Sequence, residues 1–196
     1  MEKGLLIVLS GPSGVGKGTV RKQIFKDESL NLAYSISMTT RLPRNGEVDG
    51  VDYYFVSQEE FENAIKNNEL LEYAHFVGNY YGTPKFSVEK LRSEGKNVFL
   101  EIEVEGAKKV LEEYKDDPGV LSIYLLPPSL RELAKRIRGR KSEPEEIIQE
   151  RLEKAKREMG SKTYYQFNVL NDNIARSAGE ISRLIKLKIA ANKNSK

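Results

Sequence analysis

The stretch Leu5-Leu6-Ile7-Val8-Leu9-Ser10-Gly11-Pro12-Ser13-Gly14-Val15-Gly16-Lys17 decides the fold. It begins as a short, continuous apolar run and ends as a glycine-rich turn that closes on a lysine. Thr19 to Phe25 then have helical spacing, so the opening unit is predicted to be strand, loop and helix. In such a loop the glycines let consecutive backbone N–H groups face phosphate oxygens, and the helix N-terminus adds positive potential. A phosphate site of the P-loop class is therefore predicted here.

The end of this loop departs from the general pattern. Most P-loops place a Ser or Thr hydroxyl for magnesium after the lysine, but here Gly18 follows Lys17 and the hydroxyl is displaced to Thr19. Mg²⁺ keeps much of its water shell, so nucleotide oxygens and water can supply its ligands. We expect Mg²⁺ to arrive with ATP and assign no protein ligand to the metal. The predicted ATP contacts are Gly11, Pro12, Ser13, Gly14, Val15, Gly16, Lys17, Gly18 and Thr19.

The rest of the chain predicts an α/β fold. Apolar runs recur at Asn97 to Glu103, Leu121 to Leu126 and Phe167 to Asn171, with helical segments between them, which indicates a parallel sheet flanked by helices. Capping boxes predict helix starts after Ser57, Ser129 and Ser142. Residues of about 35–83 are short, polar-alternating pieces with one helix, Gln58 to Asn68, which predicts an inserted small mixed β lobe. We expect one domain over 1–196, with a core of 1–34 and 84–196, and an amphipathic helix over Ala178 to Ile189.

Composition excludes several classes of protein. The 196 residues carry 32 basic and 29 acidic side chains, a net charge of +3, so no uniform basic face for nucleic acid is expected. With no cysteine and a single histidine, His75, disulfides, thiol catalysis and a Ser-His-Asp triad are excluded. No signal h-region or membrane-spanning stretch is present, so a cytoplasmic protein without membrane partners is expected. The oligomeric state, a homodimer among the options, is left open.

A second constellation lies in the predicted lobe. Arg41 and Arg44, with Tyr53 further on, can clamp a phosphate from several sides because guanidinium forks match phosphate geometry. The segment resembles the guanylate kinase signature. The matching positions are Thr39, Thr40, Arg41, Arg44, Glu47, Gly50, Tyr53 and Phe55.

The resemblance covers nearly the whole chain and implies transfer of the γ-phosphate of ATP to GMP, with dGMP as a second acceptor, in purine nucleotide metabolism. It implies a helical lid at about 129–160. By resemblance, the residues around the GMP phosphate are Ser37, Arg41, Arg44, Tyr53 and Tyr81. The implied contacts of guanine are Glu72 and Thr83, that of the base or ribose is Glu103, and that on the adenine side of ATP is Asn171. The implied catalytic cations are Lys17, Arg41, Arg44, Arg140 and Arg151.

The chemistry of guanine agrees with Glu72. Guanine offers an N1–H and an N2–H₂ that one carboxylate can accept together, whereas adenine offers the opposite pattern. Taken by itself, Glu72 is better explained as an ordinary solvated charge, and only the neighbouring family pattern favours a guanine contact. Glu101 and Glu103 are predicted on one face at the end of a central strand, where ligands of open α/β sheets bind. The family usually has aspartate at 103, and Lys141 and Pro144 also differ from the usual lid.

No general base is required. Phosphoryl transfer has a loose transition state that needs positioning and cations, and the acceptor phosphate is already ionised at neutral pH. His75 is therefore expected to be structural, and Arg131, Arg136 and Arg138 are as well explained by solvation or ion pairs. Two alternatives remain: an adenylate-type kinase, whose Asp-Gly-aromatic-Pro-Arg segment is absent, and a binding module that keeps the fold without catalysis.

Overall fold

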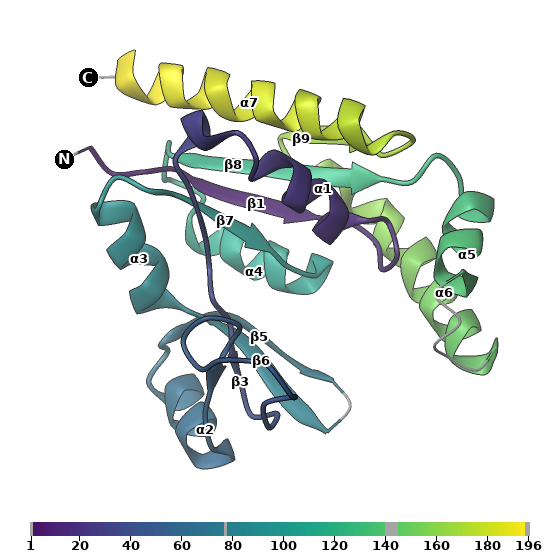
Figure 1. Ribbon diagram of the computed structural model, residues 1–196, viewed down its shortest axis with the longest axis horizontal. Coiled ribbons are helices and arrows are strands. Elements are labelled where there is room, and N and C mark those ends of the chain that lie inside the picture. Colours follow the sequence, from purple (N-terminus) through teal and green to yellow (C-terminus); the bar gives the residue numbers. More distant parts are fainter. Residues whose placement is uncertain (1, 77, 140–144, 195–196) are drawn as a thin grey trace.

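The larger sheet consists of five parallel strands with β1 at its centre. The computed structural model describes residues 2–76, 78–139 and 145–194, and the strand order is β2-β7-β1-β8-β9 (Figure 1). All four neighbouring pairs are parallel. The predicted α/β class with a parallel sheet is confirmed. The strands are β1 (Leu6–Ser10), β2 (Leu32–Tyr34), β7 (Asn97–Glu101), β8 (Val120–Leu126) and β9 (Phe167–Leu170).

The continuous apolar run of β1 follows from burial of both its faces. Alternate residues point to opposite sides of a strand, so Ile7 and Leu9 join one hydrophobic cluster while Leu6 and Val8 join the other. All four side chains are completely buried. Burying side chains of this size stabilises the fold by about 1.5–3 kcal/mol each. The strand that carries the phosphate loop is therefore held in the core on both of its faces.

Helices cover both faces of this sheet. Helix α1 (Lys17–Ile24) packs against α7 (Ile174–Asn194) on one face, while α3 (Lys85–Ser93) and α4 (Val104–Glu113) cover the other (Figure 1). Two short 3-10 turns, η1 (Glu28–Leu30) and η2 (Gly160–Tyr164), complete the core. The last helix begins at residue 174, four positions before the predicted start, because the loop after β9 is short.

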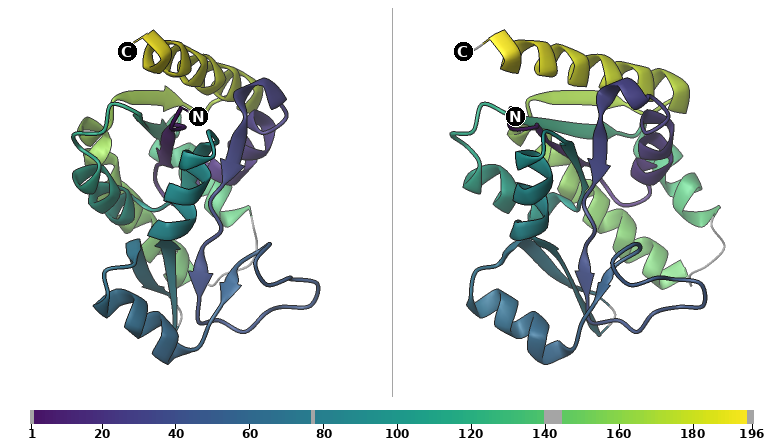
Figure 2. Two further views of the ribbon diagram at one scale, coloured as in Figure 1. Left: turned by 90° about the vertical axis from the view of Figure 1, so that its left-hand side faces the viewer. Right: turned by 60° about the vertical axis from the view of Figure 1, so that its left-hand side comes forward.

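A smaller mixed sheet has the strand order β4-β3-β6-β5. Its strands are β3 (Met38–Thr39), β4 (Tyr54–Phe55), β5 (Leu70–Phe76) and β6 (Asn79–Pro84), and α2 (Gln58–Lys66) packs on it through Phe61 and Ala64. The Ser57 hydroxyl and the Glu60 carboxylate form the predicted capping box at the start of α2. Figure 2 shows this sheet apart from the larger one, with α3 leading from one to the other.

Two helices pack together beside the phosphate loop, α5 (Leu130–Arg138) and α6 (Glu145–Met159). Ser129 caps α5 by accepting from the backbone N–H of Glu132. The third predicted cap, Ser142, lies outside the described residues, together with Arg140, Lys141 and Pro144. Across the described residues, no helix combines the length and the apolar character that a membrane span requires.

Candidate active site

The loop between β1 and α1 has the backbone of a phosphate cradle. Gly11 and Gly14 have φ angles of 149° and 85°, which L side chains rarely adopt. An added Cβ at Gly11 would lie 2.5 Å from the carbonyl oxygen of Leu125, and at Gly14 it would lie 2.5 Å from Cγ1 of Ile137. These two positions therefore require glycine both for conformation and for close packing against β8 and α5.

Lys17 lies inside this loop. Its ammonium donates to the carbonyl oxygens of Gly11 at 2.6 Å and Pro12 at 3.4 Å. Burial lowers the pKa of Lys17, and the carboxylates of Glu101 and Glu103 oppose that shift. The predicted lysine is thus a partly buried cation that contacts the carbonyl groups at the start of the loop.

Asn171 and Arg136 hold the loop from the side. The Asn171 amide donates to the carbonyl oxygen of Val15 at 2.8 Å and accepts from the Ser177 hydroxyl at 2.9 Å. The Arg136 guanidinium donates to the carbonyl oxygens of Val15 at 3.2 Å and Asn171 at 3.0 Å. Asn171 therefore lies at the predicted site, and Arg136 is a structural brace of the loop. A cavity of about 440 Å³ beside them is lined by Gly14, Gly16, Thr19, Arg136, Asn171, Asp172, Asn173 and Ile174.

The carboxylate of Glu101 stands beside Gly18. A Cβ placed on Gly18 would lie 3.4 Å from Oε1 of Glu101, so the carboxylate is near the place where other P-loops carry a hydroxyl. Its Oε2 accepts from Nε of Arg21 at 2.8 Å. Strand β7 ends at Glu101, and Glu103 is the N-cap of α4. The prediction that the strand runs to Glu103 is therefore wrong, because Val104 already begins the helix.

A second cavity of about 440 Å³ lies between the smaller sheet and α4. Glu72 and Thr83 face each other on paired strands β5 and β6, and the Thr83 hydroxyl donates to Oε1 of Glu72 at 2.6 Å. Burial raises the pKa of the Glu72 carboxyl, with the Thr83 hydrogen bond opposing the shift. The lining of this cavity includes the predicted residues Ser37, Tyr53, Glu72, Tyr81 and Glu103.

Gly106 makes room for the Glu72 carboxylate. An added Cβ at this first-turn position of α4 would lie 2.6 Å from Oε2 of Glu72. Gly106 is not among the predicted site residues. The only signal for it in the sequence is a glycine inside a helical pattern, which often marks a close-packing site.

The two predicted lobe arginines are held by one carboxylate. Oε1 of Glu47 accepts from Nη2 of Arg41 at 2.8 Å, and its Oε2 accepts from the backbone N–H of Arg44 at 2.7 Å. The Arg41 guanidinium lies 5.4 Å from the centre of the Tyr53 ring. The hydrogen bond to Glu47 raises the pKa of Arg41. Neither arginine is among the described residues that line the cavities of the core or the lobe.

Helix α6 reaches the phosphate loop from the other side. Nη2 of Arg151 donates to the Ser13 hydroxyl at 2.8 Å. Lys154 Nζ lies 2.6 Å from Oε2 of Glu103, and Glu158 is buried. Lys154 and Glu158 are not among the predicted site residues, although their spacing of three and seven residues from Arg151 places them on its helix face. These contacts bound a cavity of about 280 Å³ that includes Lys17, Arg151 and Glu158 and shares Glu101, Ile102 and Glu103 with the lobe cavity.

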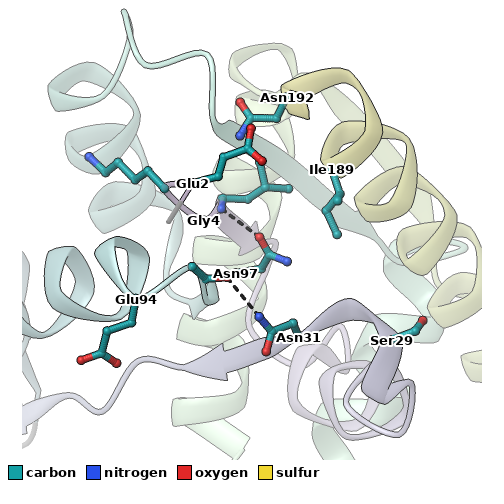
Figure 3. Close-up of a pocket in the computed structure, with 11 residues that line it drawn as sticks. Glu2, Gly4, Ser29, Asn31, Glu94, Asn97, Ile189 and Asn192 are labelled. Carbon is teal, nitrogen blue, oxygen red and sulfur yellow. Dashed lines mark hydrogen bonds between the residues drawn. The ribbon is translucent and has the colours of Figure 1, made fainter. Parts of the chain in front are cut away.

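A further hollow of about 370 Å³ lies at the opposite end of the larger sheet (Figure 3). There the Asn97 side chain accepts from the Leu5 N–H at 2.9 Å and donates to the Leu30 carbonyl at 2.7 Å, while Asn31 donates to the Gly95 carbonyl at 3.0 Å. These amides tie chain segments together. The geometry of a reaction site belongs to the carboxyl end of the strands instead.

His75 borders the lobe cavity, where its imidazole ring contacts the aromatic ring of Tyr80. Its ring lies edge-on to Tyr80, with the centroids 5.0 Å apart. Within the part of the chain that the structure describes, no group of three histidine or carboxylate side chains could hold a metal ion.

Comparisons with known proteins agree with this geometry. The family model described as "Guanylate kinase" matches residues 3–188. A guanylate kinase of Mycoplasma mycoides is 55% identical over 187 residues, which cover 95% of this chain and 62% of that protein. A guanylate kinase of Listeria monocytogenes is 54% identical over 184 residues, 94% of this chain and 88% of that protein. The chain therefore spans about three fifths of the length of the first of these relatives, 62%.

Two solved structures are also similar. The guanylate kinase of Anaplasma phagocytophilum superposes with a TM-score of 0.73 at 33% identity, covering 95% of this chain and 87% of that one. The SH3-kinase fragment of tight junction protein 3 superposes with a TM-score of 0.53 at 7% identity, covering 96% of this chain and 58% of that one. The second likeness shows the fold alone.

Proposed function

The chain belongs to the guanylate kinase family, and from this premise we propose that it transfers the γ-phosphate of ATP to GMP, with dGMP as a second acceptor, giving ADP and GDP or dGDP. The observation that carries the proposal is the common wall of two cavities. Glu101, Ile102 and Glu103 border both the phosphate-loop cavity with Lys17 and the lobe cavity with Glu72. A donor and an acceptor bound in these two places would meet end to end.

Positioned cations supply the catalysis. Charge spreads over the oxygens of the transferring phosphoryl group, so fixed donors around it lower the barrier without a covalent nucleophile. Lys17 approaches from the loop and Arg151 from α6. Arg41 and Arg44 hold the acceptor phosphate from the lobe, and Arg140 is proposed to join Arg151 although it lies outside the described residues.

Guanine is selected in the lobe cavity. The Glu72 carboxylate accepts from N1–H and N2–H₂ together, and the Thr83 hydroxyl turns from Glu72 to donate to O6. Adenine would place an unprotonated N1 against a carboxylate, which repels it. Partial burial of Glu72 strengthens this discrimination because little water is left to replace the missing donors.

We propose Mg²⁺ as the ion that accompanies ATP. When bound with ATP, this ion would supply positive charge that offsets the charge of the phosphates. The Glu101 carboxylate beside Gly18 fits its hydrated form, since an acceptor there can take hydrogen bonds from metal-bound water. Arg21 fixes the orientation of this carboxylate through its 2.8 Å bond.

A coupled assay of ADP formation with GMP, dGMP, AMP and UMP as acceptors tests the function. We expect rapid turnover with GMP, slower turnover with dGMP and little with AMP or UMP. The other candidate is a binding module that keeps the fold without catalysis, and Lys17 and Arg151 at the phosphate loop favour the enzyme. Absence of ADP with every acceptor, for a folded protein with Mg²⁺ present, would contradict the proposal.

A further inference from the structure

One face of α6 carries two charged side chains that the proposed reaction has not used. Arg151, Lys154 and Glu158 are spaced by three and four residues, so they share the face of the helix that meets the phosphate loop. Figure 1 shows α6 running from α5 back along the end of the larger sheet. Arg151 contacts Ser13 at one end of this face. Lys154 and Glu158 lie further along it.

Lys154 stands at the junction of the two cavities. Its ammonium lies 2.6 Å from Oε2 of Glu103 and 3.8 Å from Oε1 of Glu158. Lys154 borders the lobe cavity, Glu158 borders the phosphate-loop cavity, and Glu103 borders both. A phosphoryl group that passes from donor to acceptor would cross this junction.

The Lys154 ammonium is charged, and its ion pair with Glu103 is partly exposed to solvent. Burial lowers the pKa of Lys154, but the carboxylates of Glu103 and Glu158 together outweigh it and keep the pKa above its usual value. The Lys154 and Glu103 side chains are 44% and 60% exposed, so their ion pair adds little stability. Lys154 can therefore exchange Glu103 for a phosphate oxygen at small cost.

Glu158 is a fixed support for this cation. The residue is 8% exposed, and its Oε2 has no hydrogen-bond partner among the described residues. Its backbone carbonyl accepts from the Tyr124 hydroxyl at 2.8 Å, which holds the residue in place. A buried carboxylate is costly unless a cation accompanies it, and Lys154 is the cation within 4 Å of it on its own helix.

We propose that Lys154 is a further catalytic residue, which donates from its ammonium to a non-bridging oxygen of the phosphoryl group in transit, and that Glu158 is the positioning residue that holds it there. This inference rests on the proposed function. When the acceptor engages Glu103, Lys154 keeps Glu158 as its support and faces the transferring group opposite Lys17. The added cation matches the charge that spreads over the phosphoryl oxygens.

The test compares Lys154→Gln, Lys154→Arg and Glu158→Gln with the control Lys156→Gln. Lys156 lies on the same helix, and its ion pair is with Glu153 instead. Steady-state kinetics give kcat and KM, and calorimetry gives the affinities for GMP and for guanosine, which has no phosphate. We expect K154Q to lower kcat/KM by about 10- to 100-fold, as loss of a charged transition-state contact does. K154R should recover part of the lost kcat/KM, and E158Q should lower kcat/KM less than K154Q does.

The affinity measurements separate a contact with the phosphoryl group in transit from a structural brace. K154Q should lower kcat and leave the affinities for GMP and for guanosine unchanged, because the contact forms only during transfer, whereas a brace between α6 and α4 would weaken the binding of both ligands. Equal losses for both ligands, or kinetics of K154Q that match K156Q, would overturn the inference while the wild-type activity stands. Unchanged kinetics of E158Q would overturn the role of Glu158. A wild-type protein that forms no ADP with GMP would contradict the proposed function, and the inference with it.

Discussion

Glu72→Gln tests the proposed guanine site most directly. In the wild type, the carboxylate accepts from Thr83 and has its second oxygen facing the gap beside Gly106. With GMP bound, the glutamine oxygen can accept from one N–H group of guanine, but its NH₂ would then face the other N–H group. The variant therefore loses a charged hydrogen bond, which is about 2 kcal/mol. At about 1.4 kcal/mol for each factor of ten, kcat/KM for GMP should fall about 30-fold.

The same substitution should raise stability at neutral pH. Burial raises the pKa of Glu72, so the folded state binds the proton more tightly than the unfolded state does. The stabilising effect is then complete below the ordinary glutamate pKa, about 4.3, and is lost as pH rises through the raised pKa. The neutral amide avoids that loss. E72Q should therefore melt at a higher temperature than the wild type near neutral pH, and this difference should shrink toward about pH 4.

The assay pairs GMP kinetics with thermal unfolding, and Glu105→Gln is the matched control. Glu105 borders the same cavity, but its side chain is 76% exposed and pairs with Lys108. We expect the control to keep its kinetics with GMP and its melting temperature. If E72Q and E105Q have equal kcat/KM for GMP, or if E72Q melts at a lower temperature at neutral pH, the reasoning about a buried guanine acceptor is refuted.

Three further predictions follow from the same site. Lys17→Ala should lower turnover by at least about 100-fold, as loss of a preorganised donor does, with an unchanged circular dichroism spectrum; near wild-type turnover would count against the P-loop role. Gly106→Ala should lower kcat/KM for GMP and leave KM for ATP unchanged, because the added Cβ would lie 2.6 Å from the Glu72 carboxylate. A kcat/KM for GMP equal to that of the wild type would show that α4 can shift to make room. We also propose that the lobe of about 35–83 and the lid of about 129–160 close on the nucleotides; spin labels at Glu62 and Glu150 should approach each other when an ATP analogue and GMP are added, and no change beyond the error would favour a preformed cleft.

The phosphate loop could be predicted because its signals are local. Strand, turn and helix are adjacent in the chain, and the positive φ angles of Gly11 and Gly14 are conformations that glycine itself permits. The capping box at Ser57 is local as well. Hydrophobic runs likewise predicted β1, β8 and β9. Strand β2 was missed because three residues are too few for a pattern, and its place in the sheet comes from pairing with β7.

Of the site itself, the sequence determined which chemical groups are available: a lysine in a glycine loop, paired arginines and a carboxylate with a threonine. Their types are read directly from the chain, and the family pattern indicates which of them act together. The tertiary structure decided what each group contacts. Arg136 bonds to Val15, 121 positions away, and Lys154 bonds to Glu103, 51 positions away. Such contacts depend on how sheet and helices pack, because side chains distant in sequence meet only after the segments between them have folded, and no local periodicity encodes that meeting.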